Sequence, residues 1–144
     1  MTQRWVWGLM GAGLLAAFGI GWCSGAANAQ GASPTMVYEL RTYTTLPGRL
    51  PALNARFRDH TLKLFEKHGM KNVVYLTPLE GDKKDNTLVY LLAHQSRDAA
   101  RKSFADFGAD PDWKAAAAAS EKDGKIVDKV ESVFFTPTDY SPMK

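Results

Sequence analysis

The stretch Val37-Tyr38-Glu39-Leu40-Arg41-Thr42-Tyr43-Thr44 decides the fold of this chain, because it has the composition of a first β-strand. β-Branched and aromatic residues dominate it, and a Pro-Gly turn at 47–48 follows directly. Side chains alternate between the two faces of a strand, so Glu39, Arg41 and Tyr43 share one face. Three polar side chains in a row need partners, and we expect these partners later in the chain or on a second chain.

A helix is predicted to follow this turn and to end at Gly69. Pro51 is tolerated in its first turn, and glycine readily adopts the left-handed conformation that ends a helix. Apolar residues recur at helical spacing, which predicts one buried face. This predicted face consists of Leu50, Leu53, Phe57, His60 or Thr61, Leu64 and His68.

The rest of the sequence predicts strands at 73–77, 87–94 and 126–136, and helices that begin at Ser96 and Asp110. The strand at 87–94 is nearly continuous in its apolar character, so we expect it to be central and covered on both faces. The resulting order, βαββαβ, is that of the ferredoxin-like unit of the α+β class. In that unit, helices pack on one face of an antiparallel sheet.

Residues 1–29 have the pattern of a secretory signal peptide. Arg4 is the only charge there, an apolar run follows over 5–22, and Ala27-Asn28-Ala29 gives a cleavage pattern. A retained membrane anchor is the alternative, since the run is near the roughly 17 to 25 residues that a spanning helix needs. The glycines and the cleavage pattern favour removal. We therefore expect a periplasmic or secreted protein that contacts a membrane only if this segment is retained.

Cleavage would leave about 115 residues, enough for one domain. We expect a short disordered lead-in over 30–35 and a single domain over 36–140. Cleavage also removes Cys23, the only cysteine, so the mature chain would have no disulfide.

The net charge of the mature chain would be small. Without Arg4, the 17 Lys and Arg residues and the 15 Asp and Glu residues give a net charge of +2. No basic run with interleaved aromatic residues is present, so nucleic acid is not an expected partner.

Four segments of the sequence together resemble the NIPSNAP family: Tyr38-Glu39-Leu40-Arg41-Thr42-Tyr43, Pro47-Gly48, His68-Gly69 and Ala109-Asp110-Pro111-Asp112-Trp113. The resemblance implies the dimeric α/β-barrel superfamily, in which two ferredoxin-like sheets pair face to face. Its members include cofactor-free quinone-forming monooxygenases, haem-degrading enzymes and small-ligand binders, so the fold alone does not define a function. A homodimer through the sheet is expected, because the helices cover only one face and the other face carries apolar residues.

The sequence contains no strong catalytic, cofactor or metal motif. We find no Gly-x-Ser-x-Gly, no phosphate-binding Gly-x-x-x-x-Gly-Lys, no Cys-x-x-Cys and no His-Glu-x-x-His. His60 and His68 lie eight residues apart, about 12 Å along a helix. Zinc–ligand bonds of roughly 2 Å cannot bridge that distance. No cofactor and no metal site are therefore predicted.

His60 is the strongest candidate for proton transfer. It lies between Phe57 and Leu64 on the predicted apolar face, so we expect it to be buried against the sheet. It is either a core histidine satisfied by a backbone carbonyl or strand side chain, or a pocket acid–base that exchanges protons near neutral pH. His94 ends a strand, where a rim position without a special role is expected.

Glu39 and Arg41 are expected to form a charge pair, with Tyr43, Tyr75 or Tyr90 nearby. The pair could hold a dimer interface together. Alternatively it could form a pocket wall, with Arg41 as an anion clamp, because a guanidinium offers a rigid fork of donors. Trp113 either anchors its helix against the core or stacks on a ligand.

Two functions of different class are consistent with this sequence. The first is a homodimeric module that binds a small ligand or serves in assembly, without turnover. The second is a cofactor-independent monooxygenase or isomerase that acts on a small aromatic or quinone-like substrate. An enclosed pocket on which His60 and Arg41 converge would favour the enzyme, and a filled core there would favour the module.

Overall fold

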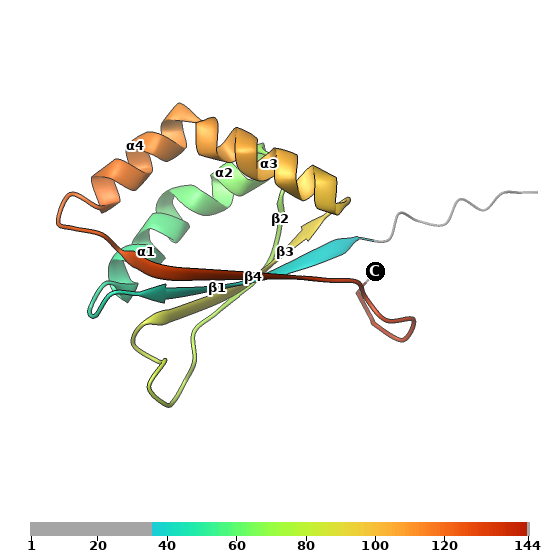
Figure 1. Cartoon of the computed structure of the whole chain (residues 1–144), viewed down its shortest axis with the longest axis horizontal. Coiled ribbons are helices and arrows are strands. Elements are labelled where there is room, and N and C mark those ends of the chain that lie inside the picture. Colours follow the sequence, from blue (N-terminus) through green and yellow to red (C-terminus); the bar gives the residue numbers. More distant parts are fainter. Residues whose placement is uncertain (1–35, 144) are drawn as a thin grey trace, which may run out of the picture. The chain divides into compact units, whose positions relative to one another are not determined.

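A computed structural model describes residues 36–143, and the predicted signal segment and lead-in (1–29 and 30–35) lie outside the described part. Its sheet contains β1 (Val37–Thr45), β2 (Lys71–Leu76), β3 (Thr87–His94) and β4 (Val127–Phe135). The spatial order is β2-β3-β1-β4, and each neighbouring pair is antiparallel. This is the predicted ferredoxin-like order, with β3 in a central position (Figure 1).

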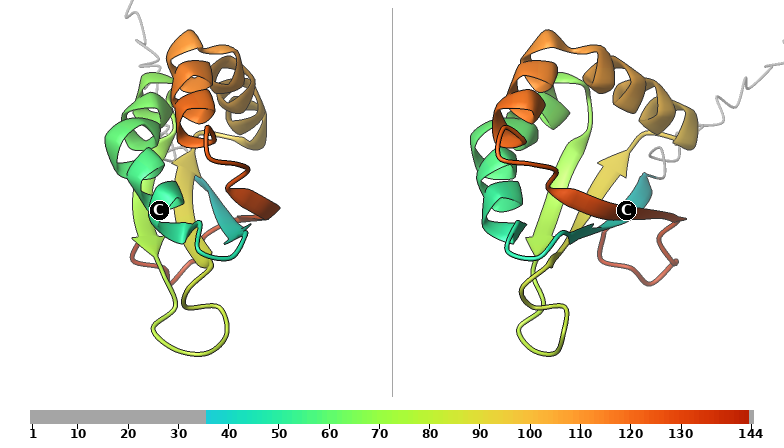
Figure 2. Two further views of the ribbon diagram at one scale, coloured as in Figure 1. Left: turned by 90° about the vertical axis from the view of Figure 1, so that its left-hand side faces the viewer. Right: turned by 60° about the vertical axis from the view of Figure 1, so that its left-hand side comes forward.

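The helices all lie on one face of the sheet (Figures 1 and 2). The first helical segment consists of α1 (Leu50–Arg56), a π-helical turn η1 (Phe57–Thr61) and α2 (Leu62–Lys67). The second helical segment consists of α3 (Arg97–Ala109) and α4 (Pro111–Ser120). Within residues 36–143, every helix is too short or too polar to cross a membrane.

The helix ends follow the capping residues that the sequence predicts. The Ser96 hydroxyl accepts a hydrogen bond from the backbone N–H of Ala99 at 3.0 Å, which satisfies a free donor in the first turn of α3. Asp110 does the same for the backbone N–H of Asp112 at 2.8 Å and so begins α4. Gly69 has φ of 75°, the left-handed conformation expected after α2. These two hydrogen bonds and the Gly69 conformation mark where α3 and α4 begin and where α2 ends.

The π-helical turn shifts which side chain of the first helix faces the sheet. A π-turn contains one more residue than an α-turn. The Thr61 hydroxyl donates to the carbonyl oxygen of Arg56 at 3.1 Å, and Thr61 is 1% exposed. His60 is exposed instead. The prediction that His60 is buried against the sheet is therefore wrong, because the extra residue gives the inward position to Thr61.

An aromatic cluster fills the space between the first helical segment and the sheet. The Phe57 ring lies at its centre, with centroid distances of 5.9 Å to Tyr43, 5.7 Å to Tyr75 and 5.1 Å to Tyr90. Tyr90 is fully buried, and Phe65 packs against the same group. Burial of each large ring contributes roughly 2 to 3 kcal/mol. The core is therefore packed with side chains beneath this segment.

The opposite face of the sheet is mostly apolar, and none of the helices within residues 36–143 lies on it. Its side chains, defined by the strand registers, include Tyr38, Leu40, Val74, Leu76, Val89, Leu91, Val133 and Phe135. Leu76, Val133 and Phe135 are 53%, 52% and 48% exposed. We call these eight residues the open face. The central strand β3 is thus covered by helices on one face only.

Candidate functional site

A buried polar cluster joins three adjacent strands. The Glu39 Oε1 atom on β1 accepts hydrogen bonds from Arg41 Nη1 at 2.7 Å and from the Ser132 hydroxyl on β4 at 2.6 Å. Its Oε2 atom lies 3.0 Å from Nε2 of His94, the last residue of β3. Glu39 and His94 are each 1% exposed. The predicted charge pair between Glu39 and Arg41 is present, and the other partners of Glu39 come from later in the chain, as expected.

The charges in this cluster stabilise one another. Burial alone would raise the pKa of Glu39, but hydrogen bonds from His94 and Ser132 and the charge of Arg41 together lower it below the usual value of 4.5. Burial would lower the pKa of Arg41, and the nearby Tyr43, Tyr90 and Glu39 instead raise it. Glu39 is therefore a carboxylate and Arg41 a cation throughout the neutral range.

A pocket of about 360 Å³ opens beside this cluster, between α3 and the strands β1 and β4. We call it the arginine pocket. It is lined by Glu39, Arg41, Arg97, Ala100, Arg101, Phe104 and Phe134. Glu39 and Arg41 therefore lie on the helix-covered face of the sheet. The two side chains thus line a pocket, as one of the two predicted arrangements requires.

Two of the three arginines in this pocket lie over aromatic rings. The Cζ atom of Arg41 is 4.4 Å from the centroid of the Phe104 ring, and that of Arg97 is 5.0 Å from the Phe134 ring. Such contacts attract a cation to the face of the ring. Each guanidinium is thereby held at the pocket by a contact that does not use its N–H donors.

Two buried polar atoms at this site, Arg41 Nε and His94 Nδ1, have no hydrogen-bond partner within residues 36–143. Arg41 Nη2 makes a long contact of 3.5 Å to the Tyr43 hydroxyl. Buried polar groups in folded proteins are nearly always paired, so unpartnered ones beside a pocket call for an explanation. A bound molecule that accepts from Arg41 Nε, or donates to His94 Nδ1, would provide one.

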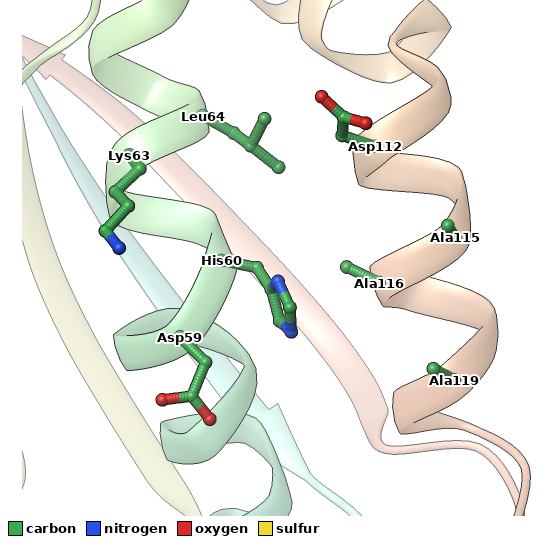
Figure 3. A pocket seen from close by; sticks show the side chains of 8 residues that line it. All are labelled: Asp59, His60, Lys63, Leu64, Asp112, Ala115, Ala116 and Ala119. Carbon is green, nitrogen blue, oxygen red and sulfur yellow. The ribbon is translucent and has the colours of Figure 1, made fainter.

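His60 lies at a different cavity, of about 510 Å³, between the first helical segment and α4 (Figure 3). Its ring points toward α4, and the remaining lining is Asp59, Lys63, Leu64, Asp112, Ala115, Ala116 and Ala119. We call this the His60 groove. It shares no lining residue with the arginine pocket. The expected convergence of His60 and Arg41 does not occur, and burial no longer supports His60 as the proton-transfer residue.

The other predicted ligand-binding residues pack within the domain. Tyr43, Tyr75 and Tyr90 belong to the aromatic cluster, where the rings of Tyr75 and Tyr90 stack at 5.3 Å. Burial raises the pKa of Tyr90 well above its usual value, so it stays protonated. Trp113 lies 4.3 Å from Phe107 between ring centroids, and Arg56 Cζ is 5.3 Å from its ring. Trp113 thus packs against neighbouring helices, as expected of a side chain that anchors its helix.

Sequence reasoning missed several residues of this site. His94 was expected at a rim without a special role, but it is buried and contacts Glu39. Its signal is alternation along β3, which places it on the same face as Tyr90 and Leu92. Arg97, Ala100, Arg101 and Phe104 were also missed, although their spacing of three and four residues puts them on one helix face.

Within residues 36–143, no group of three or more His, Cys, Asp or Glu side chains is arranged to hold a metal ion. The residues at the arginine pocket are guanidinium, aromatic and carboxylate groups. These groups can hold an anionic or flat ligand by charge, hydrogen bonds and ring contacts.

The sheet order and the one-sided helix layer define a ferredoxin-like α+β domain. Solved structures with this fold include a NIPSNAP family protein of unknown function from Agrobacterium tumefaciens, with 26% identity and a TM-score of 0.66, covering 78% of this chain and 97% of that one. A NIPSNAP-like domain protein from Burkholderia xenovorans matches at 16% identity and a TM-score of 0.65, covering 76% and 91%. SnoaB, a cofactor-independent oxygenase from Streptomyces nogalater, matches at 21% identity and a TM-score of 0.51. The match covers 75% of this chain and 98% of that one.

The sequence model of the NIPSNAP family matches residues 38–142, and the chain belongs to this family. The match begins in β1 and extends beyond β4, so it includes every residue of the arginine pocket. No match to this sequence was found among curated proteins.

Proposed function

We propose that this NIPSNAP protein is a homodimeric module that binds a small molecule in the arginine pocket. The observation that carries the proposal is the pair of buried polar atoms that have no partner within residues 36–143 and lie at or near that pocket, Arg41 Nε and His94 Nδ1. An unsatisfied buried polar group costs about 1 to 3 kcal/mol, and a hydrogen-bond partner on a ligand would recover part of this cost. The pocket volume of about 360 Å³ lies within the range of small-molecule sites.

The binding proposal is tested by filling the pocket. Ala100 is fully buried and lines the arginine pocket, so Ala100→Leu should occupy part of its volume. Ala115→Leu is the matched control, because Ala115 lines the His60 groove. In a fragment screen by ligand-observed NMR, we expect binding to be lost in Ala100→Leu and kept in Ala115→Leu, with both variants folded by circular dichroism. The reverse pattern, or binding unaffected by either change, would contradict the proposal.

The dimer forms, in this proposal, through the open face. Contiguous apolar surface of this kind is uncommon on monomers and favours an interface. Leu40 lies beside both Leu91 and Val133 in the sheet registers, so the apolar side chains are contiguous across three strands. Pairing of two such faces would also cover the second face of β3. Light scattering during size-exclusion chromatography measures the oligomeric state directly. A monomer at micromolar concentration would contradict the proposed dimer.

Export to the periplasm or to the medium is the corresponding proposal for location. It is supported by the apolar run at 5–22 and by the Ala27-Asn28-Ala29 pattern. The intact mass of the protein from its host should correspond to a chain that begins at Gln30. A full-length chain in the membrane fraction would instead support a retained anchor.

The alternative function is a cofactor-independent monooxygenase or isomerase acting on a small aromatic or quinone-like substrate. One observation favours it: the Nε2 atom of His94 lies 3.0 Å from the Glu39 carboxylate, and its Nδ1 atom is unpartnered. A carboxylate that orients a histidine is a common arrangement for general bases. SnoaB, which shares the fold, is named as a cofactor-independent oxygenase.

The test is oxygen uptake, together with product analysis, for a panel of phenols and hydroquinones. Uptake with the wild-type protein that is lost in His94→Gln would favour the enzyme over the module. His60→Gln, at the separate groove, is the control and should not alter any uptake.

A further inference from the structure

We infer that the arginine pocket binds a small monocarboxylate with a flat apolar body. This inference rests on the proposed small-molecule function and adds the chemical class of the ligand. It is carried by three features of the pocket: its charge balance, the way its guanidinium groups are held, and the rings that form its walls.

The charge balance of the pocket leaves one cation unpaired. Arg41 pairs with Glu39 at 2.7 Å, and Arg101 pairs with Asp98 at 3.1 Å. Within the described residues, Arg97 has no carboxylate within salt-bridge distance. The three guanidinium groups and two carboxylates therefore sum to a single positive charge. A monoanion would neutralise this charge, whereas a dianion would place excess negative charge beside Glu39.

The guanidinium groups are arranged to donate to a carboxylate. Arg41 on β1 and Arg97 on α3 each lie over a phenylalanine ring at the pocket. A guanidinium over a ring keeps its N–H donors in its own plane, free for an acceptor at its edge. Guanidinium and carboxylate groups match as bidentate pairs, which are stronger than neutral hydrogen bonds. Arg97 can therefore supply the main contact and Arg41 a second one from its unpartnered donor.

The walls of the pocket suit a flat apolar body. Phe104 comes from α3, Phe134 from β4, and Ala100 adds a small apolar surface between the arginines. The His94 ring lies 6.1 Å from the Phe104 centroid and 6.3 Å from the Phe134 centroid, so both phenylalanines border the same region. Aromatic walls favour a flat aromatic guest, because its ring can make offset-stacked or edge-to-face contacts with them.

Isothermal titration calorimetry with benzoate, cinnamate and 2-naphthoate, each against its neutral amide, tests the inference on the purified protein. We expect each carboxylate to bind at least about tenfold more tightly than its amide, because a charge-assisted pair replaces a neutral one. Cyclohexanecarboxylate, which is not flat, and inorganic phosphate should bind more weakly than benzoate.

Arg97→Gln should remove most of the preference for carboxylate over amide, while Arg97→Lys should keep part of it. Arg58→Gln is the matched control, since Arg58 is an exposed arginine on the first helical segment, and it should bind as the wild type does. Arg97 is exposed, so a folding defect is not expected, and thermal melting checks this.

The outcomes separate the inference from the proposed function. If acids and amides bind equally in the wild type and Arg97→Gln changes nothing, the carboxylate inference is overturned while small-molecule binding stands. Phosphate binding as tight as benzoate binding would also overturn it, in favour of a general anion site. If no probe binds and no fragment depends on Ala100, both the inference and the proposed function fail.

Discussion

Glu39 is the residue on which the polar cluster depends, because its carboxylate contacts side chains of three strands. These are Arg41 on β1, His94 on β3 and Ser132 on β4. Removal of its charge would leave the half-buried Arg41 without a counter-charge and would change the hydrogen-bond partner of the buried His94. Breaking a buried ion pair in this way is more costly than replacing both partners by apolar groups. Glu39 therefore links the stability of the sheet to the arrangement of the arginine pocket.

Glu39→Gln should lower the free energy of unfolding by about 3 kcal/mol at neutral pH, measured by urea denaturation. The pKa of Glu39 is lowered in the folded state, so its contribution is present above the unfolded value near 4.5 and is lost as pH falls through the folded value. The difference between wild type and variant should therefore shrink below pH 4.5. A difference that is constant with pH would show that the effect is steric.

Substitutions at Thr61 and His60 test which side chain of the π-helical turn faces the sheet. Thr61→Ala should cost about 1 to 2 kcal/mol, since it removes a buried methyl group and the hydrogen bond to the Arg56 carbonyl. His60→Gln, at an exposed position, should change stability by less than about 0.5 kcal/mol. Urea denaturation of both variants decides the point. A larger loss in His60→Gln would mean that His60, and not Thr61, faces the sheet.

The element α3 carries four of the seven side chains that line the arginine pocket, so its position controls the site. Its start depends on the cap from Ser96. Ser96→Ala should lower the free energy of unfolding by about 1 kcal/mol. Ser103→Ala, inside the same helix, should change it by less than about 0.5 kcal/mol. Equal effects of the two changes would show that the cap does not stabilise α3.

At the scale of elements, much of the fold could be predicted from local sequence. Val37–Thr45 is rich in β-branched and aromatic residues, Ser96 and Asp110 cap helices, and Gly69 ends one. The π-helical turn could not be predicted, because the same periodicity fits either His60 or Thr61 as the inward residue. A single added residue in one turn then moved the candidate histidine from the core to the surface.

The site was harder to predict because its parts converge only in three dimensions. Glu39 and Arg41 were identified from their position on one strand face. His94 and Ser132 complete the cluster through strand pairings that bring together residues 55 and 93 positions apart in sequence from Glu39. Arg97 supplies a free cation from a helix that lies over the same sheet. Sequence spacing alone does not reveal which side chains of different elements meet.

For the whole molecule, the open face is the feature that a single chain leaves unexplained. Val133→Asp, on the open face of β4, should shift the proposed dimer to monomers at micromolar concentration, because it places a charge in an apolar interface. Val130→Asp is the matched control: Val130 is also exposed on β4 and is paired with Tyr43, on the helix-covered face. Light scattering should show a dimer for this control. Dissociation of both variants, or of neither, would contradict an interface on the open face.

We propose that the ligand site of this protein is the arginine pocket and not the His60 groove. The most direct measurement is backbone-amide chemical-shift mapping during titration with benzoate. We predict that shifts concentrate at residues 97–104 and around Phe134, which line the arginine pocket. Shifts that concentrate instead at residues 59–64 and 112–119, around the His60 groove, would contradict it.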